Sequence, residues 1–145
     1  MISQSAEYAL RAVLWLAGHP EATLSTPEIA RRTMVPAGYL SKILQALARA
    51  GLVASTPGRA GGFILTRPAN RISVLDVISA VGQLPRIERC PLGMEGHGGH
   101  LCPLHQRLDD VAAHAERVFA DTTLAELVKE RESGGVLCET VPCLT

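Results

Sequence analysis

The hydrophobic pattern of the first 66 residues changes once, from the spacing of helices to that of strands. Apolar residues recur at helical spacing over residues 5–18 and 37–50. Between these segments, Thr26-Pro27-Glu28 is a helix start signal, which predicts a helix over about 27–33. Residues 52–55 and 63–66 then have the character of short strands around a glycine-rich turn at 56–62. The sequence therefore predicts three helices followed directly by a β-hairpin.

This order of elements is that of a winged helix-turn-helix, so we predict a mainly α fold with a small β-hairpin. In such folds the second helix of the pair enters the DNA major groove, where its polar face meets base edges and phosphates. The helix predicted at 37–50 has such a face, and the hairpin tip carries one arginine that either grips DNA or is simply solvated. The predicted DNA-binding residues are Gly38, Tyr39, Ser41, Lys42, Gln45, Arg49, Ser55 and Arg59.

Charge divides the chain into two unlike halves. Residues 1–71 hold eight basic and three acidic side chains, a net charge of +5, and residues 72–145 carry −5. This asymmetry indicates a polyanion-binding module beside a separate control region, unless it reflects chance and solvated faces. The hydrophobic content of 47% excludes a disordered chain, and the aromatic content of 3% argues against single-strand stacking platforms.

The second half begins with a helix and continues into a long loop. A capping box at 73–76 predicts a helix over 74–81, and the glycine-rich stretch 82–101 is long enough to be a functional loop. Apolar residues over 103–120 form a stripe that is either a dimer seam or an internal packing face. We predict a winged-helix domain at 1–82, a sensor loop at 83–102, a dimerisation helix and short following helix at 103–132, and a flexible tail at 133–145.

The cysteines are interpreted from the compartment that the sequence indicates. No stretch approaches the roughly 20 apolar residues of a membrane span, and the N-terminus lacks the pattern of a secretion signal. We therefore expect a cytoplasmic protein without a membrane partner, in which cysteines serve as metal or redox groups more often than as structural disulfides. Cys138 and Cys143 in the tail are interpreted as free thiols or a redox pair.

Several motifs spread over nearly the whole chain resemble a known family. They are EYALR at 7–11, GYL at 38–40, GLV at 51–53, GRAGGF at 58–63, the segment 72–81 and TTLAEL at 122–127. With these motifs the sequence resembles the Rrf-type winged-helix transcription regulators, which include the IscR- and NsrR-like iron–sulfur regulators. The hairpin motif with its preceding GLV is the most specific part. The resemblance implies a homodimer that binds double-stranded DNA.

The resemblance also implies a set of metal ligands. Cys90 matches the first cysteine of the cluster-binding members and Cys102 the last, while His105 matches a histidine ligand found in part of the family. The middle position falls near residues 96–97, where no cysteine stands. Glu7 matches an acidic ligand from the other subunit, although an i,i+4 ion pair with Arg11 is an equal alternative. His97 and His100 are spare candidates.

These ligands suit a [2Fe–2S] cluster, because two thiolates with nitrogen or oxygen ligands are a known set for such a centre. The predicted function is a DNA-binding regulator, a repressor, that senses redox state, nitric oxide or iron through this cluster at the dimer interface. One alternative is a family member without a cluster, which senses through cysteine thiols or zinc. Another is a small metalloenzyme, but the sequence has no HExxH, phosphate-binding loop or nucleophile elbow. An electron carrier would not need the polar helix face.

Overall fold

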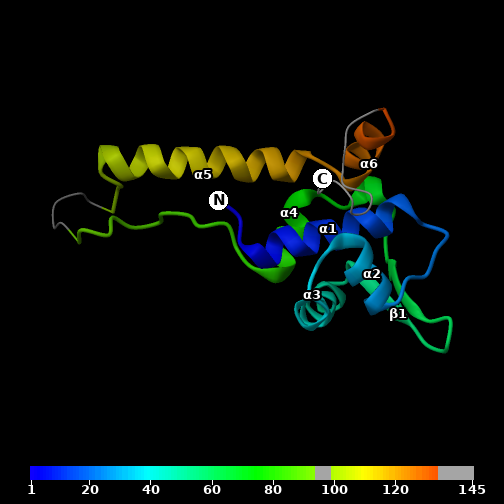
Figure 1. Cartoon of the computed structure of the whole chain (residues 1–145). Helices are drawn as coiled ribbons and strands as arrows, with labels where there is room; N and C mark the ends of the chain where they lie inside the picture. The colour runs from blue at the N-terminus through cyan, green and yellow to red at the C-terminus, as the bar shows by residue number, and fades with distance from the viewer. Residues whose placement is uncertain (94–98, 134–145) are drawn as a thin grey trace, which may run out of the picture.

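A computed structural model of the chain describes residues 1–93 and 99–133. Its elements are α1 (Gln4–Gly18), α2 (Thr26–Thr33), α3 (Ala37–Arg49), β1 (Val53–Thr56), β2 (Gly62–Leu65), the short 3-10 helix η1 (Ala69–Arg71), α4 (Val74–Val81), α5 (Pro103–Asp121) and α6 (Leu124–Glu132). Figure 1 shows helices α1 to α4 with the hairpin as one body, from which α5 extends. The predicted mainly helical fold with a small β-hairpin is confirmed, and the predicted elements begin and end within a residue or two of the observed ones.

Helices α1, α4 and α6 each begin where the side chain of the preceding residue accepts a hydrogen bond from a free N–H group of the first turn. Ser73 accepts a hydrogen bond from the backbone N–H of Asp76, and Asp76 accepts one from the N–H of Ser73, so α4 begins with a capping box. At the turn between α2 and α3, Met34 adopts the left-handed conformation with φ of 55°. This residue ends α2 and redirects the chain within three residues into α3.

One hydrophobic core joins the helices to the hairpin. The buried stripe of α3 packs against α1, α2 and the strand that follows it, and its members are Leu40, Ile43, Leu44 and Leu47. The hairpin is antiparallel, with Ser55 opposite Phe63. Gly62 lies so close to the carbonyl oxygen of Leu24 that a Cβ atom would stand 2.2 Å from it. This close approach explains the glycine, because any side chain there would push the hairpin away from the body.

Helix α6 returns to the winged-helix body instead of continuing along α5. Leu124 is completely buried in the main core, and its N–H donates to the carbonyl of Ile72 at 2.9 Å. The N–H of Val74 donates to the carbonyl of Thr122 at the same distance. The body therefore uses a residue from beyond α5 to close its core, although the sequence grouped 124–132 with the dimerisation helix. The proposed domain boundaries themselves remain predictions.

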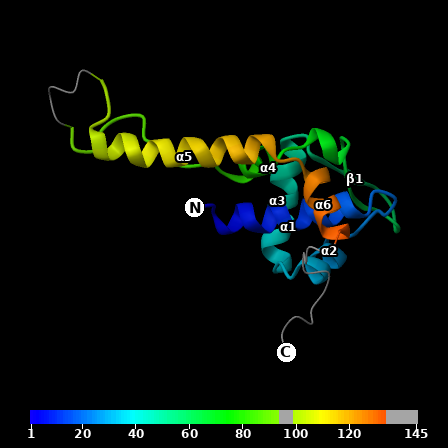
Figure 2. The same cartoon turned by 90° about the horizontal axis from the view of Figure 1, so that it is seen from above.

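Helix α5 and the segment before it form an arm that extends from the body. Figures 1 and 2 show residues 83–93 running along α5, away from the other helices. Leu104 and Leu108 on α5 are 63% and 51% exposed, and Val111 and Val118 are exposed as well. These four members of the predicted stripe are thus uncovered in the described part of the chain, whereas Phe119 of the same stripe packs against the cluster that contains Ile78. Across residues 1–93 and 99–133, no helix is long and apolar enough to cross a membrane.

Candidate metal centre and nucleic-acid interface

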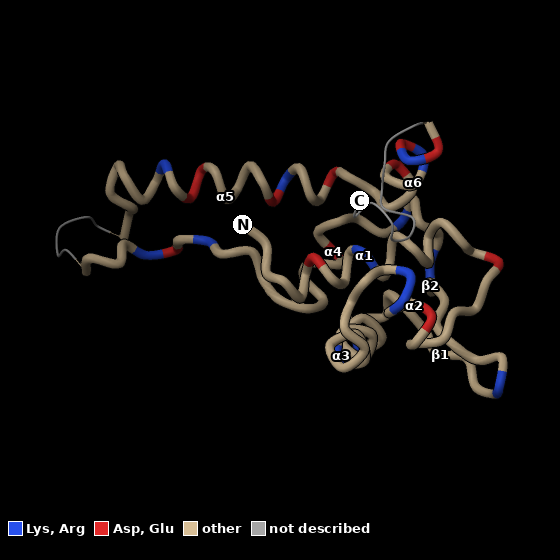
Figure 3. The backbone as a smooth tube through the Cα atoms, in the orientation of Figure 1, with Lys and Arg blue, Asp and Glu red and all other residues tan. Residues whose placement is uncertain are grey.

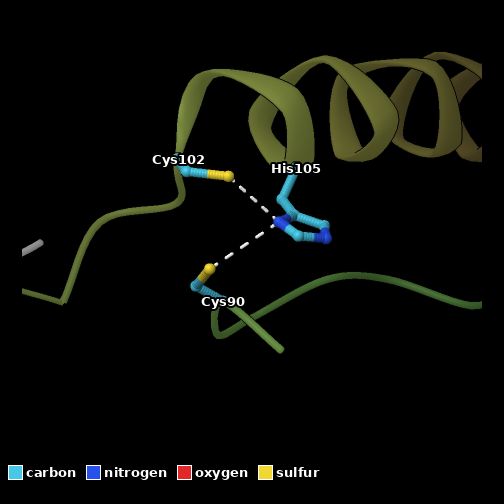
Figure 4. Close-up of side chains that lie close together, drawn as sticks. All are labelled: Cys90, Cys102 and His105. Atoms are coloured by element: carbon cyan, nitrogen blue, oxygen red, sulfur yellow. Dashed lines mark hydrogen bonds between the residues drawn. The ribbon is translucent and has the colours of Figure 1, made fainter. Parts of the chain in front are cut away.

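Three potential metal ligands meet where α5 begins, at the end of the arm that lies away from the body (Figure 1). The Nδ1 atom of His105 lies 3.0 Å from the Sγ atom of Cys102 and 3.7 Å from that of Cys90. One ligand atom of each residue lies within 4.8 Å of the others, and all three residues are half-buried. Figure 4 shows both sulfur atoms directed toward the imidazole ring, with Cys90 on the segment that runs beside α5. Residues predicted as ligands from the sequence are therefore close enough to bind one metal centre.

The start of α5 fixes two of these side chains by local geometry. Cys102 is the extended residue that precedes the helix, Pro103 fits the first helical position, and His105 follows in the first turn. The backbone N–H groups here have no partner within the helix. The N–H of His105, followed by the Cys90 side chain and the N–H of Leu104, lowers the pKa of the Cys102 thiol against the opposing effect of desolvation. A thiolate is the form that binds metals.

The donor set fits a metal centre in its chemistry. Two sulfur atoms and one imidazole nitrogen suit zinc, and they also suit a [2Fe–2S] centre in which nitrogen or oxygen completes the ligands. The three residues leave one ligand position to be filled from elsewhere. His100 is exposed and is not part of this group. His97, Cys138 and Cys143 lie outside the described residues.

An ion pair next to the three ligands is absent from the sequence-based prediction. Asp109, one helical turn after His105, accepts two hydrogen bonds of 2.8 Å from the guanidinium of Arg86. It also accepts one of 2.9 Å from the backbone N–H of Ile87. Arg86 further donates to Glu116 at 2.6 Å. Hydrogen bonds from Arg86 and then from Ile87 lower the pKa of Asp109 to about 2, so this carboxylate is ionised at neutral pH.

Glu7 lies on α1 and is engaged within its own chain. Its Oε1 atom is 2.8 Å from the Arg11 guanidinium, which is the i,i+4 ion pair considered as the alternative from the sequence. Arg11 also donates to the carbonyl of Thr33 at the end of α2, 3.4 Å away. The neighbouring Tyr8 meets Tyr39 of α3 edge to face, with ring centroids 6.2 Å apart. The role of Glu7 as a metal ligand stays a prediction.

The predicted DNA-binding residues lie on one side of the body. All eight are exposed: Gly38, Tyr39, Ser41, Lys42, Gln45 and Arg49 on α3, Ser55 on β1 and Arg59 on the hairpin tip. In Figure 1, α3 and the hairpin lie on the side of the body that faces away from α5. Figure 3 shows a basic residue at the hairpin tip and mixed charges along α5. The base- and phosphate-contacting roles of these residues stay predictions, with an arrangement that suits a groove-binding helix and a wing.

Comparison with known proteins identifies close similarity over most of the chain. Residues 2–130 match the Rrf2 family model, which is described as an iron-dependent transcriptional regulator. The transcriptional regulator IscR of Xenorhabdus nematophila is 35% identical over 133 residues, which cover 90% of this chain and 80% of that protein. IscR of Pectobacterium carotovorum is also 35% identical, with the same coverage. These relatives are transcriptional regulators, in agreement with the expectation that the chain is not an enzyme.

Solved structures show the same architecture. IscR of T. potens superposes with a TM-score of 0.77 and 27% identity, covering 94% of this chain and 92% of that one. CymR of B. subtilis, described as the global cysteine regulator, superposes with a TM-score of 0.75 and 25% identity, covering 90% and 97%. An oxidized form of Staphylococcus aureus CymR gives a TM-score of 0.70 at 25% identity, covering 89% and 96%.

Proposed function

Because this chain belongs to the Rrf2 family of transcriptional regulators, we propose that it is a dimeric repressor controlled by a metal centre at Cys90, Cys102 and His105. The observation that carries the proposal is the convergence of these three ligands at the start of α5. That position joins residues 83–93, which we term the sensor segment, to the helix whose exposed apolar stripe supports dimerisation. A change at the ligands can therefore reach both copies of the DNA-binding body.

DNA contact is assigned to α3 and the hairpin. Lys42 and Gln45 are exposed on the outer face of α3, where an amide can recognise base edges and an ammonium group can contact bases or phosphates. Arg59 at the hairpin tip reaches the phosphate backbone or the minor groove beside the same site. A single recognition helix binds weakly, so two copies over two half-sites supply the affinity.

Dimerisation is assigned to the exposed stripe of α5. Leu104, Leu108, Val111 and Val118 would otherwise keep an apolar face in water along a helix that projects from the body. A second copy of the same helix covers this face in a two-fold arrangement, in which each stripe meets its equivalent. The two bodies then carry their recognition helices at a spacing that the α5 pair determines.

The metal centre is proposed to be a [2Fe–2S] cluster held by Cys90, Cys102 and His105, with Glu7 of the partner subunit as the fourth ligand. Such a cluster supplies a group that responds to redox state, nitric oxide or iron supply. Cys102 and His105 hold their positions through the first turn of α5, whereas Cys90 depends on the course of the segment 83–90. Release of Cys90 would free the end of this segment from the start of α5, and this change would alter the spacing of the recognition helices.

Glu7 connects the proposed centre to the recognition helix through its own chain. In the structure it pairs with Arg11, and Arg11 contacts the carbonyl of Thr33, where α2 ends. A carboxylate that turns toward a metal gives up this ion pair, so Arg11 is left to its contact with α2. We therefore expect the contact between Arg11 and the end of α2 to change when Glu7 leaves Arg11 for the metal, and with it the turn between α2 and α3.

Ligand variants test the proposal directly. Protein prepared without oxygen is compared with Cys90→Ala, Cys102→Ala and His105→Ala, using DNA fragments selected from a random library by the wild-type protein. We expect each variant to lose bound iron and to shift the affinity for the selected DNA at least tenfold in the same direction. Arg107→Ala, an exposed change on the first turns of α5, serves as the control. Ligand variants that keep both iron content and DNA affinity would contradict the proposal.

The second candidate is a cluster-free regulator that senses through the Cys90 and Cys102 thiols or through zinc. The lowered pKa of Cys102 and the closeness of the two sulfur atoms favour it, as does the likeness to CymR, which is known in an oxidized form. In this scheme the Cys102 thiolate attacks hydrogen peroxide and becomes a sulfenic acid while hydroxide leaves. Cys90 then displaces water to form a disulfide. A colourless protein with one zinc per chain, or with this disulfide after peroxide treatment, would favour this candidate.

A further inference from the structure

We propose that Arg86 and Asp109 are positioning residues that hold Cys90 against Cys102 and His105, an inference that rests on the proposed metal centre. The two residues and the backbone N–H of Ile87 form what we term the clamp. The clamp lies next to the ligands and joins the two parts of the arm, the sensor segment and α5. Asp109 is four residues after His105 on α5, and Ile87 is three residues before Cys90 on the sensor segment.

The geometry of the clamp distinguishes it from an ordinary surface ion pair. Asp109 is only 9% exposed and receives three hydrogen bonds, two of 2.8 Å from the Arg86 fork and one of 2.9 Å from Ile87. A forked arginine–carboxylate pair fixes direction as well as distance. The third hydrogen bond fixes the backbone itself, so the clamp sets the path of the chain as it approaches Cys90.

The clamp matters because its three hydrogen bonds tie the sensor segment to α5 shortly before Cys90. Residues 83–90 contain no helix or strand. Without the clamp, Cys90 is tethered to Cys102 through twelve residues of chain that include several glycines. With the clamp, Cys90 is only three residues away from Ile87, which is held at Asp109, one helical turn after His105. The probability that Cys90 meets Cys102 and His105 falls as roughly the 3/2 power of the tether length. A tether that lengthens from three to twelve residues when the clamp is lost therefore lowers this probability about eightfold.

Glu116 contributes less to this function than Asp109. It accepts a hydrogen bond of 2.6 Å from Arg86 but none from the backbone of residues 83–93, and both side chains are about 40% exposed. Its contact orients the free end of the guanidinium, whereas Asp109 joins α5 to the sensor segment. Glu116→Gln therefore provides a graded comparison with Asp109→Asn.

The experiment measures how strongly Cys90 and Cys102 are brought together, with and without metal. In a full-length background carrying Cys138→Ser and Cys143→Ser, the two thiols are equilibrated with reduced and oxidised glutathione. Each protein disulfide that forms reduces one oxidised glutathione to two thiols, so the equilibrium constant gives the effective concentration of the pair. Zinc affinity is measured on the reduced protein by competition with a chelator. Arg89→Ala is the matched control, an exposed arginine on the same segment.

We expect Arg86→Ala and Asp109→Asn to lower the effective concentration about eightfold and zinc affinity by a similar factor. Arg89→Ala and Glu116→Gln should change either value less than twofold. Arg86→Lys keeps the positive charge but loses the two-pronged hydrogen bonding of the guanidinium. Its effective concentration and zinc affinity should therefore lie between those of the wild type and those of Arg86→Ala. Thermal unfolding of each variant checks that the winged-helix body is intact.

The possible results separate this inference from the proposed function. An unchanged effective concentration in Arg86→Ala, or an equal loss in Arg89→Ala, overturns the clamp. A wild-type protein that binds neither zinc nor iron while Arg86→Ala still lowers the effective concentration leaves the clamp standing and removes the metal centre.

Discussion

Truncation of Leu124 tests whether α6 is an integral part of the winged-helix body. Its side chain is 0% exposed in the core that includes Ile72, and its backbone N–H is hydrogen-bonded there. Leu124→Ala removes three carbon atoms from this core, for a transfer loss of about 2.4 kcal/mol. The remaining cavity raises the cost to about 3–4 kcal/mol, since large-to-small changes in rigid cores exceed the transfer term.

Urea denaturation of Leu124→Ala should therefore give a free energy of unfolding lower by about 3–4 kcal/mol, with an unchanged slope against urea. The corresponding fall in melting temperature is roughly 10 °C for a chain of this size. Leu92→Ala is the control, because Leu92 is mostly exposed and its truncation should change stability by less than about 0.5 kcal/mol. A cost below about 1 kcal/mol for Leu124→Ala would refute the packing of α6 into the core.

Three further predictions concern DNA binding, the dimer and acid stability. Arg59→Ala should reduce the slope of log affinity for DNA against log salt by about 1.8 per dimer, at about 0.9 per lost phosphate contact; an unchanged slope measured by fluorescence anisotropy argues against a phosphate contact. Leu108→Glu should convert the protein to a monomer in sedimentation and weaken DNA binding more than tenfold, whereas a persisting dimer removes the α5 seam. Asp109→Asn should lower the urea midpoint by a constant amount above about pH 5. Because the folded pKa of Asp109 is depressed to about 2, this difference should disappear as pH falls from about 4 through 2, and a pH-independent difference contradicts the ionised clamp.

The winged-helix body could be predicted from the sequence because its signals are local. Helical spacing, capping boxes and the glycine-rich hairpin each act within a few residues, so their boundaries follow from the neighbouring chain. Gly62 is a partial exception: the local motif marked a turn, but the reason for the glycine is a backbone contact with Leu24, 38 residues earlier, that leaves no room for a side chain. The position of α6 was not predicted, because the burial of Leu124 depends on a contact with Ile72, 52 residues earlier in the sequence.

The residues of the candidate site could be predicted to different degrees, because some of their contacts are local in the sequence and others are not. Cys102 directly precedes α5 and His105 lies in its first turn, so their spacing already placed them together. The approach of Cys90 rested on the family resemblance, since a glycine-rich loop has no preferred path of its own. The pairing of Arg86 with Asp109 spans 23 residues, and its sequence signal is weak: an aspartate one turn after the histidine does not indicate which cation it meets.

The central claim is that Cys90, Cys102 and His105 hold an iron–sulfur cluster. The most direct measurement is the visible absorption spectrum of wild-type protein purified without oxygen, with iron and acid-labile sulfide assayed on the same sample. We predict broad bands at about 400–460 nm with iron and sulfide in equal amounts, near two of each per chain. A colourless protein that takes up no iron or sulfide on reconstitution would contradict the claim and transfer the sensing role to the thiols or zinc.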